Sequence, residues 1–246
     1  AYSDEEQTFY GMLTEFILSG KAYASTLAAS DQRLAMLVLI AMQKLASSSV
    51  AAIRRALRGR LQRLLEQRQK HDELKRKLED LRAEYTSLED LGPNDEIGRV
   101  EEEIAELAAI QLMTDEEPRL RELLAAADRV AKETKIEKVL SLVEGRFAER
   151  SVAFFTEYKA TQSLLMSQLI QRFGDDSVAF INGDGRADEV VGRDGRKRSI
   201  NQKREDAAES FNEGWVRFLI STEAGGEGID LQERCHSLVH VDLPWN

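Results

Sequence analysis

The chain has 246 residues, and Asp and Glu outnumber Lys and Arg by 44 to 34, which gives a formal net charge of −10. With 42% hydrophobic and 32% charged residues, the composition excludes a disordered or collagen-like chain and supplies enough apolar side chains for a packed core. The acidic total gives no global attraction to nucleic acid, although a local basic surface could still bind it.

Three further features bear on the compartment. The longest apolar run covers only residues 34–42, whereas a membrane span needs about 20 apolar residues, so no transmembrane segment is expected. The N-terminus lacks a basic region followed by an apolar stretch, so we expect no secretory signal. Cys235 is the only cysteine and cannot form an internal disulfide, which favours a reducing compartment. We therefore expect a soluble, cytoplasmic protein with no membrane partner.

The first half of the chain has helical periodicity. Ser3 and Glu6 have the spacing of a capping box at the start of a first helix. A second apolar helix is predicted over about residues 32–45, and the serines at 47–49 offer a cap for a third. A further helix is expected to start near Thr114. We therefore predict an all-helical region over residues 1–131.

A coiled-coil hairpin is predicted within this region, over about residues 57–112. Apolar residues repeat in steps of three and four on both sides of a Gly-Pro pair at 92–93, which should end the first arm. Such a hairpin could bind a protein partner. Two interpretations of its basic start remain open. Either its charges attract the acidic second arm, or a stripe of arginines contacts a phosphate backbone (Arg54, Arg55, Arg58, Arg60 and Arg63).

The pattern changes in residues 132–246. Short, continuously apolar stretches alternate with helix-length segments, at residues 151–156, 177–182, 216–221 and 237–242. This alternation predicts an α/β unit whose parallel sheet is covered by helices on both faces. Ligands bind such sheets at the carboxyl ends of the strands, so the residues that follow each stretch form the candidate site.

Recognisable motifs follow these strands in order: FFTEYKAT at 154–161, STEAGGEGIDLQ at 221–232 and VDLPWN at 241–246. The set resembles the second RecA-like lobe of superfamily 2 helicases, and most closely the bacterial Swi/Snf-type DNA-dependent ATPases. The resemblance implies a RecA-like parallel sheet in residues 132–246. The last motif of that family continues into an arginine cluster, so we expect the chain to be a fragment truncated before it.

The resemblance also implies half of an ATP cleft. Gly225, Gly226 and Gly228 would face the nucleotide, and glycines permit positive φ and close approach of the backbone to phosphate. Asp230 would approach the ATP sugar or phosphates. We expect ATP and Mg²⁺ as cofactors of the intact parent protein, and none bound tightly by this chain alone. A tight turn packed under a helix is the alternative for the glycines.

Half of a DNA track is implied as well, with duplex DNA as the partner. Hydroxyl groups suit this task because they donate to phosphate oxygens without reading a sequence. The candidates after the strands, together with one motif arginine, are Thr156, Ser221, Thr222 and Arg204. Arg196 and Arg198 belong to a basic stretch at 183–198, which we interpret as a mobile loop that touches DNA. The alternatives are an ordinary surface arginine for Arg204 and solvated disorder for the stretch.

ATP hydrolysis in this superfamily needs a G-x-x-x-x-G-K-[ST] loop and an acidic pair after a buried strand, and the sequence has neither in a suitable place. Cys235 and His240 lack metal-ligand spacing. We therefore expect part of a parent ATPase that translocates on DNA, inactive without the first RecA-like lobe of the same parent. The alternatives are an RNA-directed helicase lobe and a coiled-coil interaction scaffold with a degenerate α/β domain.

Overall fold

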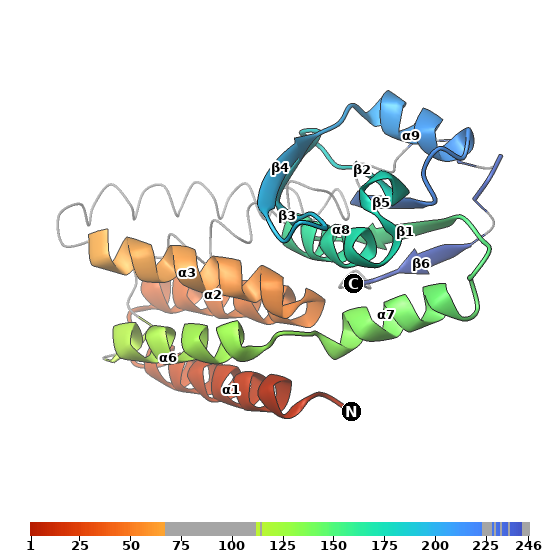
Figure 1. Cartoon of the computed structure of the whole chain (residues 1–246). Helices are drawn as coiled ribbons and strands as arrows, with labels where there is room; N and C mark the ends of the chain where they lie inside the picture. The colour runs from red at the N-terminus through yellow and green to blue at the C-terminus, as the bar shows by residue number, and fades with distance from the viewer. Residues whose placement is uncertain are drawn as a thin grey trace. The chain divides into compact units, whose positions relative to one another are not determined.

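The computed structural model of the chain describes residues 1–66, 112–113, 115–222, 228, 230–231, 233–235 and 237–242. It forms two compact units, which divide along the chain between Thr134 and Lys135. The first unit is helical and the second contains the sheet (Figure 1). Most of the predicted coiled-coil hairpin lies outside the described residues. Among the helices that are described, none is both long enough and apolar enough to cross a membrane.

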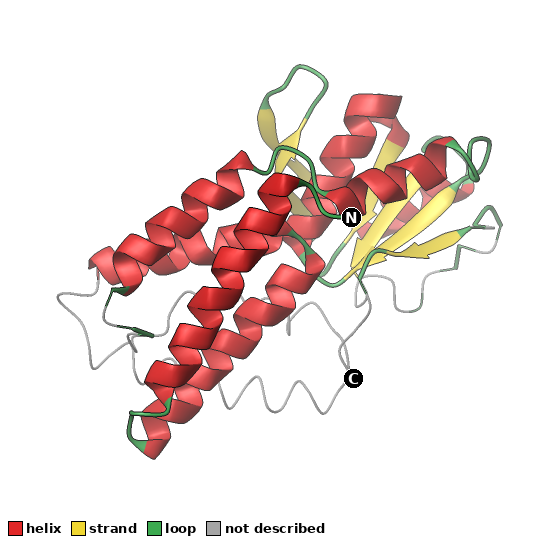
Figure 2. Cartoon of the chain, turned by 90° about the horizontal axis from the view of Figure 1, so that it is seen from below, coloured by secondary structure: helices red, strands yellow, loops and turns green. Residues whose placement is uncertain are grey.

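The helical unit contains α1 (Asp4–Ala24), α2 (Ala29–Ser48), α3 (Val50–Glu66) and α6 (Glu116–Arg129). α1 packs against α2 and α6, and α3 packs against the same two helices. Apolar residues three and four positions apart supply the buried face of each helix, as Phe9, Leu13 and Phe16 do in α1. Figure 2 shows these helices as long rods lying alongside one another. Within the described residues of the N-terminal part of the chain, the predicted all-helical character is confirmed.

The helix starts follow the predicted caps. Glu6 N donates to Ser3 Oγ (3.2 Å) and Ser3 N donates to Glu6 Oε2 (2.8 Å), so the capping box is confirmed. Ser49 Oγ accepts from the third N–H of α3 at 3.0 Å. The first two N–H groups of α3 donate to Glu133, at 2.9 and 3.0 Å. Burial nevertheless raises the pKa of the Glu133 carboxyl above its ordinary value, because desolvation outweighs these hydrogen bonds.

Arg60 is not part of a surface stripe, so the second of the two open interpretations is wrong at this position. Its side chain is 0% exposed and pairs with Glu116, which is 1% exposed. Glu116 also accepts from Leu112 N at 2.6 Å. Arg54 and Arg58 remain at the surface, where each approaches a carboxylate oxygen on α6. The buried face of α3 therefore includes a guanidinium, which the heptad pattern does not reveal.

The second unit is an α/β fold, as predicted. Its sheet has the order β2-β5-β1-β6, and every pair of neighbours is parallel. Its strands are β1 (Val152–Thr156), β2 (Val178–Ile181), β5 (Phe218–Thr222) and β6 (Leu238–His240). Its helices are α7 (Thr134–Glu144), α8 (Lys159–Phe173) and α9 (Arg204–Asn212). The arrangement matches the expected RecA-like architecture.

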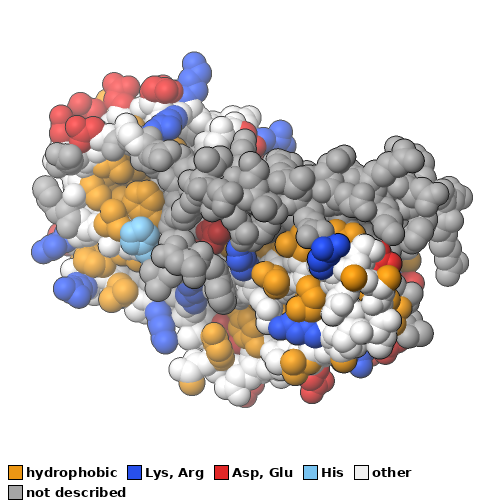
Figure 3. Space-filling view, turned by 180° about the vertical axis from the view of Figure 1, so that it is seen from behind, with side chains coloured by type: hydrophobic (Ala, Val, Ile, Leu, Met, Phe, Trp, Pro, Cys, Tyr) orange, Lys and Arg blue, Asp and Glu red, His pale blue; other side chains and the backbone are white. Residues whose placement is uncertain are grey.

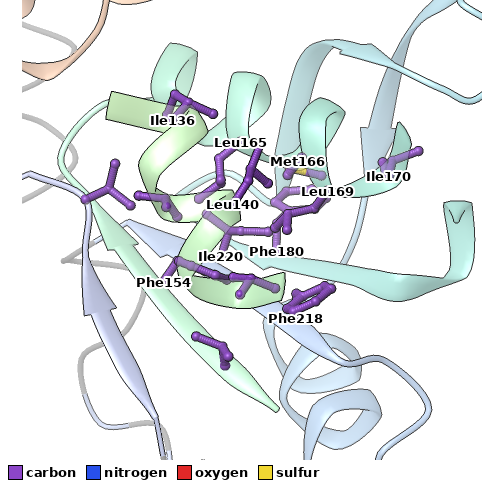
Figure 4. Packing of buried hydrophobic residues seen from close by; sticks show 14 of the residues in the cluster. Ile136, Leu140, Phe154, Leu165, Met166, Leu169, Ile170, Phe180, Phe218 and Ile220 are labelled. Atoms are coloured by element: carbon purple, nitrogen blue, oxygen red, sulfur yellow. The ribbon is translucent and has the colours of Figure 1, made fainter. Parts of the chain in front are cut away.

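Both faces of β1, β2 and β5 are buried, which explains why these strands are apolar, whereas the edge strand β6 is largely exposed. Phe154 and its neighbours on one face pack with residues of α7 and α8, as Figure 4 shows. Ala153 points to the other face, where it packs with Leu219 and with Phe211 of α9.

Residues 183–198 are not a mobile loop, and that prediction is wrong. They contain most of an antiparallel hairpin, β3 (Arg186–Val191) and β4 (Lys197–Asn201). Ala187 and Val190 are both buried in the core of the sheet although they are three residues apart. Glu189 lies between them at φ 58°, where the register shifts. This bulge turns both apolar side chains inward and hides the usual alternation of a strand.

Candidate functional site

The carboxyl ends of the four parallel strands define one edge of the sheet, which we call the carboxyl edge. Thr156 pairs with Thr222 in the β1–β5 register, and Ile181 pairs with Ser221 in the β2–β5 register. Three predicted site residues, Thr156, Ser221 and Thr222, therefore lie side by side on adjoining strands. This edge is where ligands bind in sheets of this kind.

The hydroxyl groups of these three residues differ in availability, although all three side chains are buried. Thr156 Oγ1 donates to Asp242, and Ser221 Oγ donates to the carbonyl of Thr222 at 2.7 Å. Thr222 is 0% exposed, and its Oγ1 has no hydrogen-bond partner within the described part of the chain. Of the three, Thr222 is the one whose hydroxyl has no partner among the described residues, and that hydroxyl is buried in this structure.

Asp242 organises one side of the carboxyl edge. One carboxylate oxygen accepts from Lys135 Nζ, and the other accepts from Thr156 Oγ1 and from Glu157 N (3.2 Å). The Asp242 side chain is buried, so these donors compensate the loss of water around its charge. The group, called here the Asp242 cluster, ties the first turn of α7 to the end of β1 and to the residues that follow β6.

Gln162 organises the other side. It lies in the first turns of α8 and is 0% exposed. Its Nε2 donates to the carbonyls of Ile181 and Ile220 at 2.9 Å each, and its Oε1 accepts from Asn182 Nδ2 at 2.8 Å. Asn182 also binds the backbone of Arg186 through N–H and carbonyl, at 3.2 and 3.0 Å. We call Gln162, Asn182 and the two carbonyls the Gln162 clamp.

An ion pair lies beside this clamp. Lys159, the first residue of α8, approaches Asp184 in the turn after β2 with an Nζ–Oδ1 distance of 2.5 Å. Burial alone raises the pKa of Asp184, but the hydrogen bonds from Lys159 and from the backbone outweigh it and hold the pKa below its usual value. The turn therefore carries a charged carboxylate at neutral pH.

Arg204 and Gly228, both predicted site residues, are neighbours. Gly228 has φ 72°, and a Cβ placed on it would lie 4.0 Å from Arg204 Nη2. Asp230 is exposed, and its carbonyl accepts from Asn212 Nδ2 at 2.9 Å. Both ends of α9 therefore meet the segment that follows β5. Gly225 and Gly226, the remaining predicted glycines, fall outside the described residues.

Arg196 and Arg198 lie elsewhere. Arg198 pairs with Asp175, which precedes β2 and so belongs to the opposite edge of the sheet. Val191 N donates to Ser167 Oγ of α8 at 2.9 Å, so β3 runs along that helix away from the carboxyl edge. Arg196 is exposed in the turn of the hairpin. The structure does not bring these two arginines together with Thr222.

Sequence reasoning assigned no site role to four residues that hold the edge in place: Lys135, Gln162, Asn182 and Asp242. The positions of Asn182 and Asp242 at the ends of apolar strand stretches are the signal that marks them. Gln162 and Lys135 carry no comparable signal, because their partners are distant in sequence. Within the described part of the chain, no three His, Cys, Asp or Glu residues are grouped so as to hold a metal ion.

Comparison with known proteins agrees with this geometry. Residues 134–246 match the family model described as the helicase conserved C-terminal domain. A Bacillus subtilis (strain 168) protein described as the uncharacterized ATP-dependent helicase YqhH is 36% identical over 120 residues. That match covers 48% of this chain and only 18% of the relative. No solved structure matches the chain. The parallel sheet, its carboxyl edge and these matches together support a helicase C-terminal lobe in residues 134–246.

Proposed function

We propose that this chain supplies one lobe of a Swi/Snf-type motor that hydrolyses ATP and moves along duplex DNA. The observation that carries the proposal is the carboxyl edge. The unit that matches the helicase C-terminal domain contains the hydroxyl of Thr222 at this edge, partnerless among the described residues, and also the neighbouring pair of Arg204 and Gly228. The Bacillus subtilis relative is described as an ATP-dependent helicase, which supports ATP as the energy source.

The ATP-facing part of this lobe comprises Gly225, Gly226, Gly228 and Asp230. Gly228 fits a phosphate-binding role, because its positive φ leaves the backbone open and a guanidinium lies beside it. Mg²⁺ would be held together with the nucleotide by the other RecA-like lobe of the parent protein. Binding and hydrolysis of ATP would supply the free energy that closes and opens the two lobes. We expect the chain alone to show no DNA-stimulated ATP hydrolysis, and turnover by the purified chain would contradict this.

The proposed DNA-facing part rests on Arg204 and on Thr222, whose buried hydroxyl would reach a phosphate only after a local rearrangement uncovers it. A hydroxyl and a guanidinium both donate to phosphate oxygens. Thr156 and Ser221 would contribute by fixing the backbone of the track, since their own hydroxyl protons are used inside the protein. Arg196 and Arg198 would form a second, separate contact through the β3–β4 hairpin. On the face that Figure 3 shows, the visible basic side chains stand apart from one another, so binding through this face would depend on a few local contacts.

The test is binding of a fluorescein-labelled DNA duplex to the whole chain across a salt series of about 50 to 200 mM. We expect Arg204→Ala to weaken binding and to reduce the slope of log K against log salt by about one unit, as loss of one phosphate contact does. Thr222→Val should weaken binding without changing the slope. Arg121→Ala, which removes an exposed arginine of α6, is the matched control. Unchanged affinity in both site variants would refute the proposed track.

The same experiment separates the alternatives. Tighter binding to RNA than to duplex DNA of equal length would favour an RNA-directed lobe. No binding to either nucleic acid would favour an interaction scaffold, in which the predicted helical hairpin binds a protein partner.

A further inference from the structure

We propose that the turn of the β3–β4 hairpin, residues 192–196, binds the phosphate backbone of duplex DNA through Arg193 and Arg196. The inference rests on the proposed function and narrows it, because it adds Arg193 to the DNA-binding surface and assigns the hairpin's contact to its turn. This contact lies away from the carboxyl edge, so its failure can be told apart from failure of the track at Arg204.

The turn has a well-defined backbone. Gly192 N donates to the carbonyl of Arg196 at 3.1 Å, and Gly195 N donates to the carbonyl of Gly192 at 2.9 Å. Asp194 Oδ1 accepts from Arg196 N at 3.0 Å. Gly195 has φ 75°, a conformation that glycine adopts without steric cost. These hydrogen bonds close the turn on itself, so its arginine side chains start from a fixed backbone.

The hairpin is in turn fixed to the α/β unit. Two apolar side chains of β3 are buried in the core of the sheet, and the strand packs along α8 (Figure 1). Val191 N donates to Ser167 Oγ of α8 at 2.9 Å. One turn further along that helix, Gln171 Nε2 donates to the carbonyl of Gly192 at 3.5 Å. The hairpin turn therefore lies beside the last turn of α8.

The positive charge that is not compensated within the hairpin gathers at this turn. Arg193 and Arg196 are both exposed, and neither forms an ion pair within the described part of the chain. Asp194, between them, uses a carboxylate oxygen to bind the backbone of the turn. The other basic residues of the hairpin already have carboxylate partners: Arg186 with Asp188, Lys197 with Glu189 and Arg198 with Asp175.

A phosphate backbone is the partner that this chemistry fits. A guanidinium presents a planar fork of N–H donors that matches a phosphate group. Contacts to phosphate carry no sequence information, which suits a lobe that moves along DNA. Arg198 would contribute less than Arg193 and Arg196, because a phosphate would first have to displace Asp175.

The length of α8 sets the distance between the hairpin turn and the carboxyl edge. Lys159 begins the helix just after the carboxyl end of β1, and Gln171 contacts the turn. At about 1.5 Å per residue, the helix between these two residues spans about 18 Å. That distance corresponds to about five base pairs at about 3.4 Å each, so one duplex is long enough to reach both contacts.

The test is binding of a fluorescein-labelled duplex of about 20 base pairs to the whole chain, across a salt series of about 50 to 200 mM. Arg193→Gln combined with Arg196→Gln should weaken binding and reduce the slope of log K against log salt by about 1.8, since each phosphate contact contributes about 0.9. Over this salt range, the unaltered chain should therefore lose about twelvefold more affinity than the double variant. Arg146→Gln combined with Arg150→Gln is the matched control, because it removes two charges from exposed positions that precede β1 and should leave the slope unchanged.

A second measurement needs no variant. Phenylglyoxal modifies exposed arginine side chains, and mass spectrometry of peptides reports the extent of modification at each position. Duplex DNA should protect Arg193 and Arg196 from the reagent and leave Arg146 and Arg150 as reactive as before. Unchanged reactivity of both turn arginines at saturating DNA would overturn the inference, and so would a double variant that binds like the control.

These outcomes separate the inference from the proposed function. If the unaltered chain binds no DNA, the proposed function fails and this inference fails with it. If binding depends on Arg204 but not on the hairpin turn, only the inference fails. If binding depends on the turn but not on Arg204 or Thr222, the inference holds and the proposed track at the carboxyl edge fails.

Discussion

Replacing Arg60 by methionine should destabilise the helical unit strongly, although arginine on a polar-looking helix face is usually dispensable. Arg60 is 0% exposed and Glu116 is 1% exposed. Without the guanidinium, the carboxylate keeps only the Leu112 N–H among the hydrogen bonds described for it. A buried charge that loses its partner costs about 3–5 kcal/mol. Methionine fills a similar volume with a flexible chain, so little of this cost comes from a cavity.

Two further variants isolate the charge effect. Arg58→Ala removes an exposed arginine that lies 3.6 Å from Asp128, and a surface pair of this kind contributes about 0–1 kcal/mol. Adding Glu116→Gln to Arg60→Met removes the stranded charge while keeping an acceptor for Leu112 N. We expect this double variant to recover most of the lost stability, because a neutral pair can replace a buried ion pair at little cost.

The assay is hydrogen exchange of the whole chain, read by mass spectrometry on peptides from α3 and α6. A loss of about 3–5 kcal/mol corresponds to exchange that is roughly a hundredfold to several thousandfold faster, since each 1.4 kcal/mol is a factor of ten. Peptides from α8 serve as the internal reference. If Arg60→Met exchanges no faster than Arg58→Ala, Arg60 is at the surface in solution and the burial argument is refuted.

Three other predictions follow. Asp242→Asn should speed exchange in β1 by about 10- to 100-fold, because one charge-assisted hydrogen bond is worth about 1.5–3 kcal/mol; unchanged exchange would count against the Asp242 cluster. Gly214→Ala and Gly195→Ala both place alanine at positive φ, 76° and 75°. Each should therefore cost about 1–2 kcal/mol in urea unfolding, and a much larger loss at Gly214 would mean that the overlying Arg234 side chain cannot move. Burial raises the pKa of Glu133 in the folded state. The protonated carboxyl therefore contributes most to stability at pH values below the ordinary carboxyl pKa, and this contribution is lost as the pH rises through the folded-state pKa. The stability advantage of the wild type over Glu133→Gln should therefore shrink as pH rises above about 4.5, and an advantage that grows with pH would contradict this sign.

The predicted strands match the observed ones closely because burial on both faces of β1, β2 and β5 demands continuous apolar runs. The stretch at 151–156 contains β1, and the other three stretches locate β2, β5 and β6. The capping box at Ser3 and Glu6 was equally readable, because both partners lie within one turn of the same helix. This part of the fold can therefore be predicted from the periodicity of apolar residues and from contacts between residues close in sequence.

The rest depends on partners that are far apart in sequence. Arg60 and Glu116 are separated by 56 positions, so nothing near Arg60 marks it as buried. The β3 strand does not show the alternation of apolar and polar residues that predicts a strand, because the bulge at Glu189 brings Ala187 and Val190 to the same face. At the site, the positions of Thr156, Ser221 and Thr222 on one edge follow from strand order. Which of their hydroxyl groups have hydrogen-bond partners could not be predicted, because the partners are Asp242 and a backbone carbonyl.

The strand order has a consequence for biosynthesis. Of the described strands in the parallel sheet, β1 pairs only with β5 and β6, and β2 pairs only with β5. No ladder of this sheet can therefore close until Thr222 has been added to the chain. At about 5–20 residues per second, β1 waits roughly 3–13 s for its first neighbour. During that interval its apolar residues depend on α7 and α8 for cover, which makes the nascent α/β unit most vulnerable to aggregation before β5 emerges.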